Sequence, residues 1–171
     1  WENGIHVCMA TPTTAQPAWM SKKYPEVLPV DIQGRKRTHG MRVFFCHNSA
    51  KYRERAAALA EQMASHFASH PALVGWHVAN EYGTYCYCPT CQAKFRQWLK
   101  EKYGTIEELN RRWNTIFWSH TYQSFDQVES PSPRGESMLH ALNLDWKRFV
   151  THQTADFAEK EKEALQAGGC Y

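Results

Sequence analysis

Two short apolar segments, separated by one long amphipathic segment, constrain the fold of this chain more than any other feature. Residues 5–10 and 73–79 have the length and apolar character of strands. Between them, apolar residues recur on one face of a helix that Asn48 or Ser49 can cap and Pro71 ends. Two strands joined by a crossover helix run parallel. The sequence therefore predicts a parallel strand–helix–strand unit and an α/β fold class.

The remaining elements follow from capping residues and prolines. Pro89 can begin a helix that Gly104 closes, and Thr105 with Glu108 forms a capping box. We expect helices at residues 89–104, from Thr105 onward and at 138–167, a short extended segment at 42–46, and irregular chain at 11–40 and 119–136.

Long loops follow the C-terminal ends of both predicted strands. In (β/α)8 barrels, this is the face that carries the chemistry. A doubly wound sheet would give the same element order, so periodicity leaves the two architectures open. Neither strand is followed by a glycine-rich phosphate loop, which disfavours a nucleotide-binding doubly wound sheet.

Composition excludes two classes of partner. Lys and Arg total 20 and Asp and Glu total 17, which gives a net charge of +3 with no basic stripe. We therefore expect no nucleic-acid partner. No apolar run approaches the roughly 18 residues of a membrane span, so we expect no membrane partner either. The many aromatic residues suit both a packed core and a site that stacks on sugar rings.

Three cysteines form a Cys-x-Cys-x2-Cys motif in a turn before a helix: Cys86, Cys88 and Cys91. Three thiols this close cannot all pair with one another. A tetrahedral structural zinc site needs four ligands, and Cys46 can supply the fourth. Four thiolates leave no open position for water, so the metal would be structural, and they indicate a reducing, cytoplasmic location. The alternative is a reactive or disulfide-bonded cluster in a secreted protein.

Other cysteines and histidines have simpler predicted roles. Cys8 lies in the first predicted strand and Cys170 can begin another, so both are predicted to be small core residues. His47 and His77 are spare ligand candidates that we expect to be ordinary core or loop histidines.

Glu81 is the candidate general acid. It follows Asn80 at the end of an apolar strand, where a carboxylate is costly without a function. Apolar and aromatic surroundings would raise its pKa and suit it to proton donation. The alternative is an exposed glutamate on a loop. Asn80 can bind a substrate hydroxyl, and Arg42 can either do the same or form a surface ion pair.

A series of motifs resembles glycoside hydrolase family 42, the β-galactosidases. The segment Trp-His-Val-Ala-Asn-Glu-Tyr-Gly at residues 76–83 resembles that family's strand-end motif. The agreement continues, in order, at residues 11–13, 17–19 and 24–26, at Arg42 and Cys46, at Cys86, Cys88 and Cys91, and at residues 95–99, 103–105, 109–110, 117–119 and 144–149. The resemblance thus covers nearly the whole chain.

The resemblance implies a partial (β/α)8 TIM barrel, from about the third strand through the fourth helix. Residues 1–171 would be a fragment of a single glycosidase catalytic domain, truncated at both ends. The implied reaction is retaining hydrolysis of terminal non-reducing β-D-galactose. Glu81 would be the general acid/base, Arg42 and Asn80 would bind the sugar in the −1 subsite, and Trp118 would form part of its wall. The resemblance also implies zinc on the four cysteines and a homotrimer.

One departure concerns the second carboxylate. A retaining glycosidase needs two carboxylates about 5 Å apart, and the family's nucleophile lies at a later strand. Glu129 and Glu136 match no nucleophile position, so the 171-residue chain alone is expected to be inactive. Two alternatives stay open: a related retaining glycosidase acting on α-L-arabinopyranosides, and a non-catalytic, zinc-stabilised interaction or sugar-binding module.

Overall fold

The computed structural model describes residues 1–170, which form two compact units. Unit 1 contains residues 1–29, 37–84 and 153–170, and unit 2 contains Val30–Lys36 and Tyr85–His152. In chain order the elements are β1 (Val7–Ala10), α1 (Ala18–Lys23), the 3-10 turn η1 (Pro25–Val27), α2 (Ala50–Phe67), β2 (Leu73–His77), α3 (Pro89–Tyr103), α4 (Ile106–Trp113), the 3-10 turns η2 (Phe117–Ser119) and η3 (Phe125–Gln127), and α5 (His140–Ala167). None of the helices in residues 1–170 is both long enough and apolar enough to cross a bilayer.

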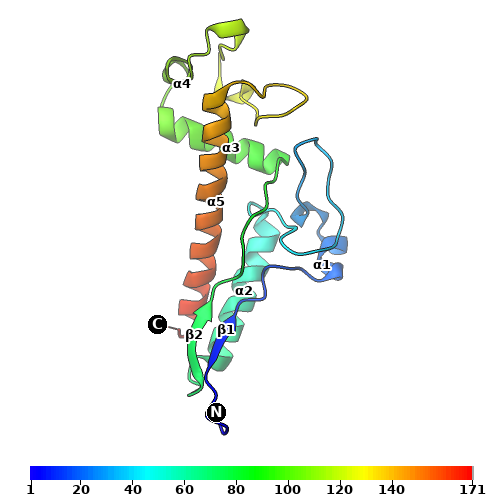
Figure 1. Cartoon of the computed structure of the whole chain (residues 1–171), viewed down its shortest axis with the longest axis vertical. Coiled ribbons are helices and arrows are strands. Elements are labelled where there is room, and N and C mark those ends of the chain that lie inside the picture. Colours follow the sequence, from blue (N-terminus) through cyan, green and yellow to red (C-terminus); the bar gives the residue numbers. More distant parts are fainter. Residues whose placement is uncertain (171) are drawn as a thin grey trace. The chain divides into compact units, whose positions relative to one another are not determined.

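Unit 1 contains the predicted parallel strand–helix–strand unit. The strands β1 and β2 lie side by side (Figure 1). They pair in parallel, with Cys8 opposite Gly75 and Ala10 opposite His77. The helix α2 connects them, and Trp76 of β2 packs against a buried cluster that contains Ala60 and Ala64 of this helix. The α/β class predicted from the sequence is thereby confirmed.

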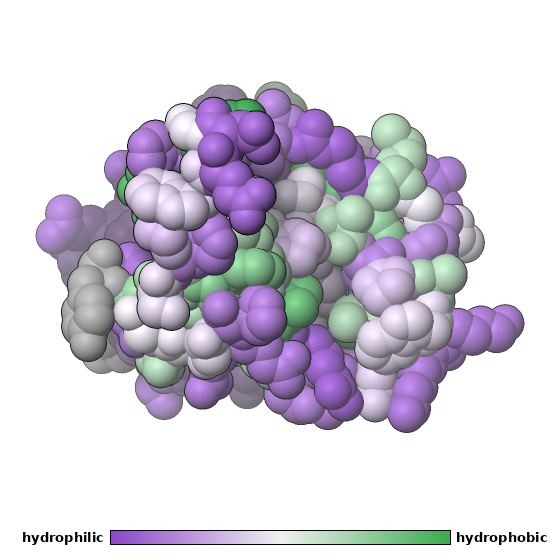
Figure 2. Space-filling model, turned by 90° about the horizontal axis from the view of Figure 1, so that it is seen from below, coloured by the Kyte–Doolittle hydropathy of each residue, from purple (hydrophilic) through white to green (hydrophobic). Residues whose placement is uncertain are grey.

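The strands are more exposed than their apolar character would suggest. Within the described residues the sheet has only two strands, so much of both strands remains open. Val7 is 43% exposed and Val74 is 65% exposed. Cys8 is also exposed, so its assignment to the core was wrong, whereas Cys170 is half-buried against a cluster of buried residues from α2 and α5. The face seen in Figure 2 shows apolar side chains at the surface among polar ones.

The helix α2 begins where the sequence predicted. The Oγ atom of Ser49 accepts a hydrogen bond from the backbone N–H of Tyr52 at 3.3 Å, as an N-cap residue should. Ala60 and Ala64 lie on its buried face and pack against α5. A Cβ at Gly168, just after α5, would lie 2.5 Å from the Cβ of Ala64. Small residues thus let these two helices approach closely.

Two short helices lie in the stretch 11–40, which the sequence predicted to be irregular. Pro17 is the N-cap residue of α1, and Pro25 begins η1. Proline lacks an N–H and has a fixed φ, so it suits the first turn of a helix as well as a break in one. The prediction was wrong because it treated every proline in this stretch as a breaker.

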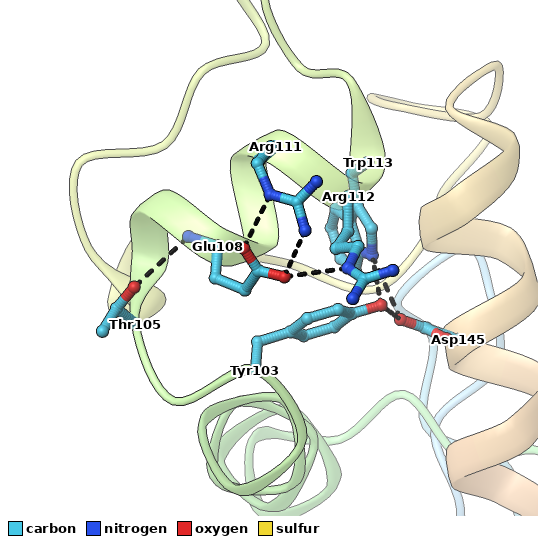
Figure 3. A network of polar contacts seen from close by, with 7 residues as sticks. All are labelled: Tyr103, Thr105, Glu108, Arg111, Arg112, Trp113 and Asp145. Atoms are coloured by element: carbon cyan, nitrogen blue, oxygen red, sulfur yellow. Dashed lines mark hydrogen bonds and ion pairs between the residues drawn. The ribbon is translucent and has the colours of Figure 1, made fainter.

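The capping predictions hold in unit 2. The helix α3 begins at Pro89 and ends at Gly104, whose φ of 75° belongs to the left-handed region. The Oγ1 atom of Thr105 accepts from the N–H of Glu108 at 3.2 Å and starts α4. The Glu108 carboxylate also pairs with the guanidinium groups of Arg111 and Arg112 (Figure 3).

A buried carboxylate on α5 joins the helices of unit 2. Asp145 is 1% exposed and accepts hydrogen bonds from the Tyr103 hydroxyl at 2.6 Å and from Nε1 of Trp113 at 3.1 Å (Figure 3). Lys102 also pairs with it. Burial alone would raise the pKa of Asp145, but hydrogen bonds from Lys102, Tyr103 and Trp113 outweigh burial and hold the pKa below its usual value.

We predict that Asp145→Asn destabilises the protein by about 2 kcal/mol at neutral pH, because the amide replaces a charge-assisted acceptor of several hydrogen bonds. The folded-state pKa is lowered, so the contribution of Asp145 is complete above the unfolded pKa of about 3.9 and is lost as pH falls through the folded value. Urea unfolding of both proteins between pH 7 and pH 3 measures the difference. Asp126→Asn, at an exposed site, is the matched control. A destabilisation that grows as the pH falls would contradict the assignment.

Candidate active site and cysteine cluster

Threonine hydroxyls from the loop after β1 hold the loop after β2. The Oγ1 atom of Thr11 accepts a hydrogen bond from the N–H of Ala79 at 2.7 Å. The Oγ1 atom of Thr14 accepts from the N–H of Asn80 at 3.2 Å and donates to the carbonyl of Asn80 at 3.4 Å. The backbone that carries Asn80 and Glu81 is therefore fixed by side chains nearly 70 residues earlier in the chain.

The segment around Arg42 was predicted to be extended, and this prediction was wrong. Met41 and Val43 have φ values of 62° and 52°, so the chain turns sharply on both sides of Arg42. The carbonyl of Thr14 accepts the N–H of Val43 at 2.7 Å, and the Thr84 hydroxyl donates to the Val43 carbonyl. These tertiary hydrogen bonds override the local preference for extended chain.

The structure brings two of the predicted site residues together. The Nη2 atom of Arg42 lies 3.0 Å from Oε2 of Glu81. Their side chains are 52% and 73% exposed, so Glu81 does not lie among apolar groups as the sequence analysis expected. Exposed pairs of this kind contribute about 0–1 kcal/mol to stability. The carboxylate and the guanidinium are thus both accessible to a ligand.

Left-handed backbone is concentrated at the residues predicted to bind substrate. Among residues 1–170, the non-glycine residues with positive φ are Met41, Val43, Ala79, Glu81, Asn114, Trp118 and Ser119. Two of them flank Arg42, two flank Asn80, and Asn114 is the C-cap of α4. Such residues cost about 1–3 kcal/mol each and persist where the surroundings fix them. The strain therefore coincides with the candidate site.

Trp118 belongs to unit 2, on the turn η2. Its side chain is 74% exposed and stacks on Phe117 with ring centroids 4.6 Å apart. An exposed indole face of this kind can pack against the apolar face of a sugar.

The sequence analysis missed a buried glutamate that contacts the residue after Glu81. Glu161 of α5 is 1% exposed, and it accepts a hydrogen bond from the Tyr82 hydroxyl. Burial raises the pKa of Glu161, and the hydroxyls of Thr13 and Tyr82 partly oppose this effect. The helical spacing of the sequence could have indicated its burial. Phe157 and Leu165, four residues before and after Glu161, are apolar and lie on the same helix face, and both are buried.

His47 is buried among aromatic rings. It is 4% exposed, and its ring contacts those of Phe45 and Tyr82. Burial, with a contribution from the positive charge of Arg53, lowers the pKa of His47 to about 4. The prediction of an ordinary core histidine is confirmed, and His77 is an exposed residue of β2.

The three cysteines of the Cys-x-Cys-x2-Cys motif lie together in unit 2. The Sγ atoms of Cys86, Cys88 and Cys91 are within 4.8 Å of one another. Cys88 is the N-cap of α3, and the N–H of Val30 donates to Sγ of Cys86 at 3.4 Å. In a tetrahedral zinc site, sulfur atoms are about 3.8 Å apart. The spacing of these three thiols is compatible with a metal site.

Cys46 is buried in unit 1 just before α2. Its N–H donates to the carbonyl of Val27 at 2.8 Å, and its carbonyl accepts the N–H of Ser49 at 3.0 Å. The backbone of Cys46 is thus fixed on both sides.

Comparison with known proteins identifies the class. A family model of glycoside hydrolase family 42, described as β-galactosidase, matches residues 1–168. The β-galactosidase BglY of Alicyclobacillus acidocaldarius is 53% identical over 163 residues, which are 95% of this chain and 24% of that protein. The chain therefore belongs to the family 42 β-galactosidases.

Solved structures agree with this assignment. The cold-adapted β-galactosidase from Rahnella sp. R3 matches with a TM-score of 0.96 and 50% identity over 98% of this chain and 25% of that one. A catalytic mutant of Gan42B, a GH42 β-galactosidase from G. stearothermophilus, matches with a TM-score of 0.93 and 51% identity over 94% of this chain and 24% of that one. The chain spans about a quarter of the length of these relatives.

We predict that Arg42→Gln changes the free energy of unfolding by less than about 1 kcal/mol, because the pair it breaks is exposed. Arg53 is the matched comparison. Its side chain is 18% exposed, lies 2.6 Å from Asp156 and donates to the His47 carbonyl at 2.5 Å. We expect Arg53→Gln to cost about 2 kcal/mol. Thermal unfolding of both variants tests this, and an Arg42 variant as unstable as the Arg53 variant would show that Arg42 is chiefly structural.

Proposed function

We propose that a protein carrying this chain is a retaining β-galactosidase that releases terminal non-reducing β-D-galactose, with Glu81 as its general acid/base. The observation that carries this proposal is the accessible Arg42–Glu81 pair on two strained loops, in a chain of the β-galactosidase family. Glu81 protonates the glycosidic oxygen as the bond breaks. It then takes a proton from the water that hydrolyses the glycosyl–enzyme intermediate.

Retention requires a second carboxylate about 5 Å from the first. Glu136 in unit 2 does not suit this role, because it pairs with His120 at 2.7 Å and accepts the N–H of Leu139 at the start of α5. We assign the nucleophile to a glutamate outside these 171 residues. The chain alone is then inactive.

The other site residues are proposed to bind the sugar in the −1 subsite. Arg42 and Asn80 each present donors for sugar hydroxyls, and the loops that carry them are held by the same residue, Thr14. Trp118 is proposed to form part of the wall of this subsite, with its exposed indole against the sugar ring.

We propose that residues 1–171 belong to one (β/α)8 catalytic barrel and provide about its third strand through its fourth helix. The parallel pair β1 and β2 with its crossover helix supports this arrangement. Further strands beside this pair would cover apolar residues such as Val7 and Val74, which are exposed here. Active sites of such barrels lie at the C-terminal ends of the strands, where Asn80 and Glu81 are found.

We propose a structural zinc ion held by Cys46, Cys86, Cys88 and Cys91. The thiols of the last three residues lie close enough to share one metal, and the donor set is the one that zinc prefers. The ion would fix the loop before α3 without entering the reaction. Reduced thiols in this number favour the cytoplasm. A homotrimer is proposed on the family resemblance.

For the general acid/base, we predict the effect of Glu81→Ala in the full-length protein that carries this chain. The substitution should lower kcat/KM for methyl β-D-galactopyranoside by at least about 100-fold, because the methoxide leaving group needs protonation. The first step with 4-nitrophenyl β-D-galactopyranoside is largely spared, and azide restores turnover of that substrate. Steady-state kinetics with and without azide measure this, and Glu107→Ala, at an exposed site on α4, is the control. Equal losses on both substrates without azide rescue would overturn the role.

The same assay separates the alternatives. A preference for 4-nitrophenyl α-L-arabinopyranoside over the galactoside would indicate the related glycosidase. No turnover of either substrate by the wild-type protein, together with bound zinc, would indicate a non-catalytic module.

For the metal, we predict about one zinc ion per chain in protein purified under reducing conditions, measured by plasma emission spectrometry. Cys88→Ser should lose most of the zinc and lower the thermal midpoint, because a structural metal contributes to folding free energy. Cys8→Ser, at an exposed cysteine of β1, should retain both. Full zinc occupancy in the Cys88 variant would contradict the ligand assignment.

A further inference from the structure

Glu161 has a buried carboxyl group that the proposed reaction does not use. This group contacts Tyr82, the residue that follows Glu81. Glu161 is on the buried face of α5 in unit 1, and the Tyr82 hydroxyl donates a hydrogen bond to it. Tyr82 directly follows Glu81 in the sequence. Glu161 is therefore linked to the candidate acid/base through a single intervening residue, Tyr82.

The pKa of Glu161 also responds to the loop after β1. The Thr13 hydroxyl lies close enough to lower the pKa of Glu161. Thr13 precedes Thr14, which bonds to the backbone of both Asn80 and Val43. The carbonyl of Thr13 accepts the Tyr52 hydroxyl at 2.5 Å, which fixes this loop from the side of α2.

Aromatic rings surround this polar junction. The Tyr82 ring lies 5.6 Å from that of Phe157, and Tyr52 stacks on Phe45 with centroids 4.0 Å apart. A carboxyl in such surroundings costs several kcal/mol unless its hydrogen bonds are satisfied. An apolar residue at position 161 would continue the face formed by Phe157 and Leu165 at lower cost. In the described residues Oε2 of Glu161 accepts the Tyr82 hydroxyl while Oε1 has no hydrogen-bond partner, so the contact with Tyr82 is the reason for a carboxyl here.

We propose that Glu161 is a positioning residue for Glu81: by accepting the hydrogen bond of the Tyr82 hydroxyl, it fixes the turn that carries Glu81. This inference rests on the proposed function. The backbone of Glu81 is in the left-handed region, with φ of 54°, and it needs such external support. When the Tyr82 hydroxyl is not held, the turn relaxes toward the right-handed region, and the Glu81 carboxylate moves away from the glycosidic oxygen.

Misplacement of a general acid has a specific kinetic signature. It slows substrates with poor leaving groups more than activated ones, because only the former need the proton. A displacement of about 1 Å can cost up to 100-fold. The ratio of kcat/KM for 4-nitrophenyl β-D-galactopyranoside to that for methyl β-D-galactopyranoside therefore reports the position of Glu81. A residue that only supports stability leaves this ratio unchanged.

The test uses Tyr82→Phe, Glu161→Leu and Glu161→Gln in the full-length protein that carries this chain. We expect Tyr82→Phe and Glu161→Leu to raise the ratio about tenfold, at a temperature where each variant is folded by circular dichroism. Glu161→Gln keeps an acceptor oxygen and should stay within about threefold of wild type. Glu163→Gln, on the exposed side of the same helix and paired with Lys160, should not change the ratio.

The outcomes separate this inference from the proposed function. An active wild-type protein whose ratio is unchanged in Tyr82→Phe and Glu161→Leu overturns the positioning role alone. A wild-type protein that hydrolyses no galactoside overturns both. If Glu161→Leu does not fold, Tyr82→Phe decides the question, because it removes a single oxygen atom.

Discussion

The candidate site depends on the hydrogen bonds of one residue, Thr14. Its hydroxyl binds the N–H and the carbonyl of Asn80, and its carbonyl accepts the N–H of Val43. The loop that carries Glu81 and the loop that carries Arg42 are therefore fixed to one another through this threonine. Without these bonds, neither left-handed turn has a local reason to persist, because the residues involved are not glycines.

The polar groups around this point differ sharply in exposure. Arg42 and Glu81 face solvent, whereas the groups that hold their loops, including Thr11, Thr14 and Glu161, are buried or partly buried. Buried hydrogen bonds fix geometry more firmly than exposed ion pairs do. The arrangement thus combines an accessible pair of charged side chains with a rigid backbone, which is what proton transfer at a defined atom requires.

Sequence reasoning predicted the elements whose signals are local. The parallel strand–helix–strand unit, the Ser49 cap, and the ends of α3 at Pro89 and Gly104 depend on residues within a few positions of each other. The turn at Arg42 depends on Thr14 and Thr84, which no local pattern indicates. For the same reason Glu161 was missed, since the meaning of its carboxyl comes from Tyr82, 79 residues earlier. For Glu81 the sequence left an apolar setting and an exposed loop position open, and its side chain is 73% exposed.

The hydrogen bonds of the loop after β1 limit how the sequence of this site can change. Because the residues from Thr11 to Thr14 bond to two other loops at once, an insertion or deletion there would displace Arg42 and Asn80 together. Insertions and deletions among related enzymes, and in any attempt to redesign specificity, should therefore be resisted at residues 11–14.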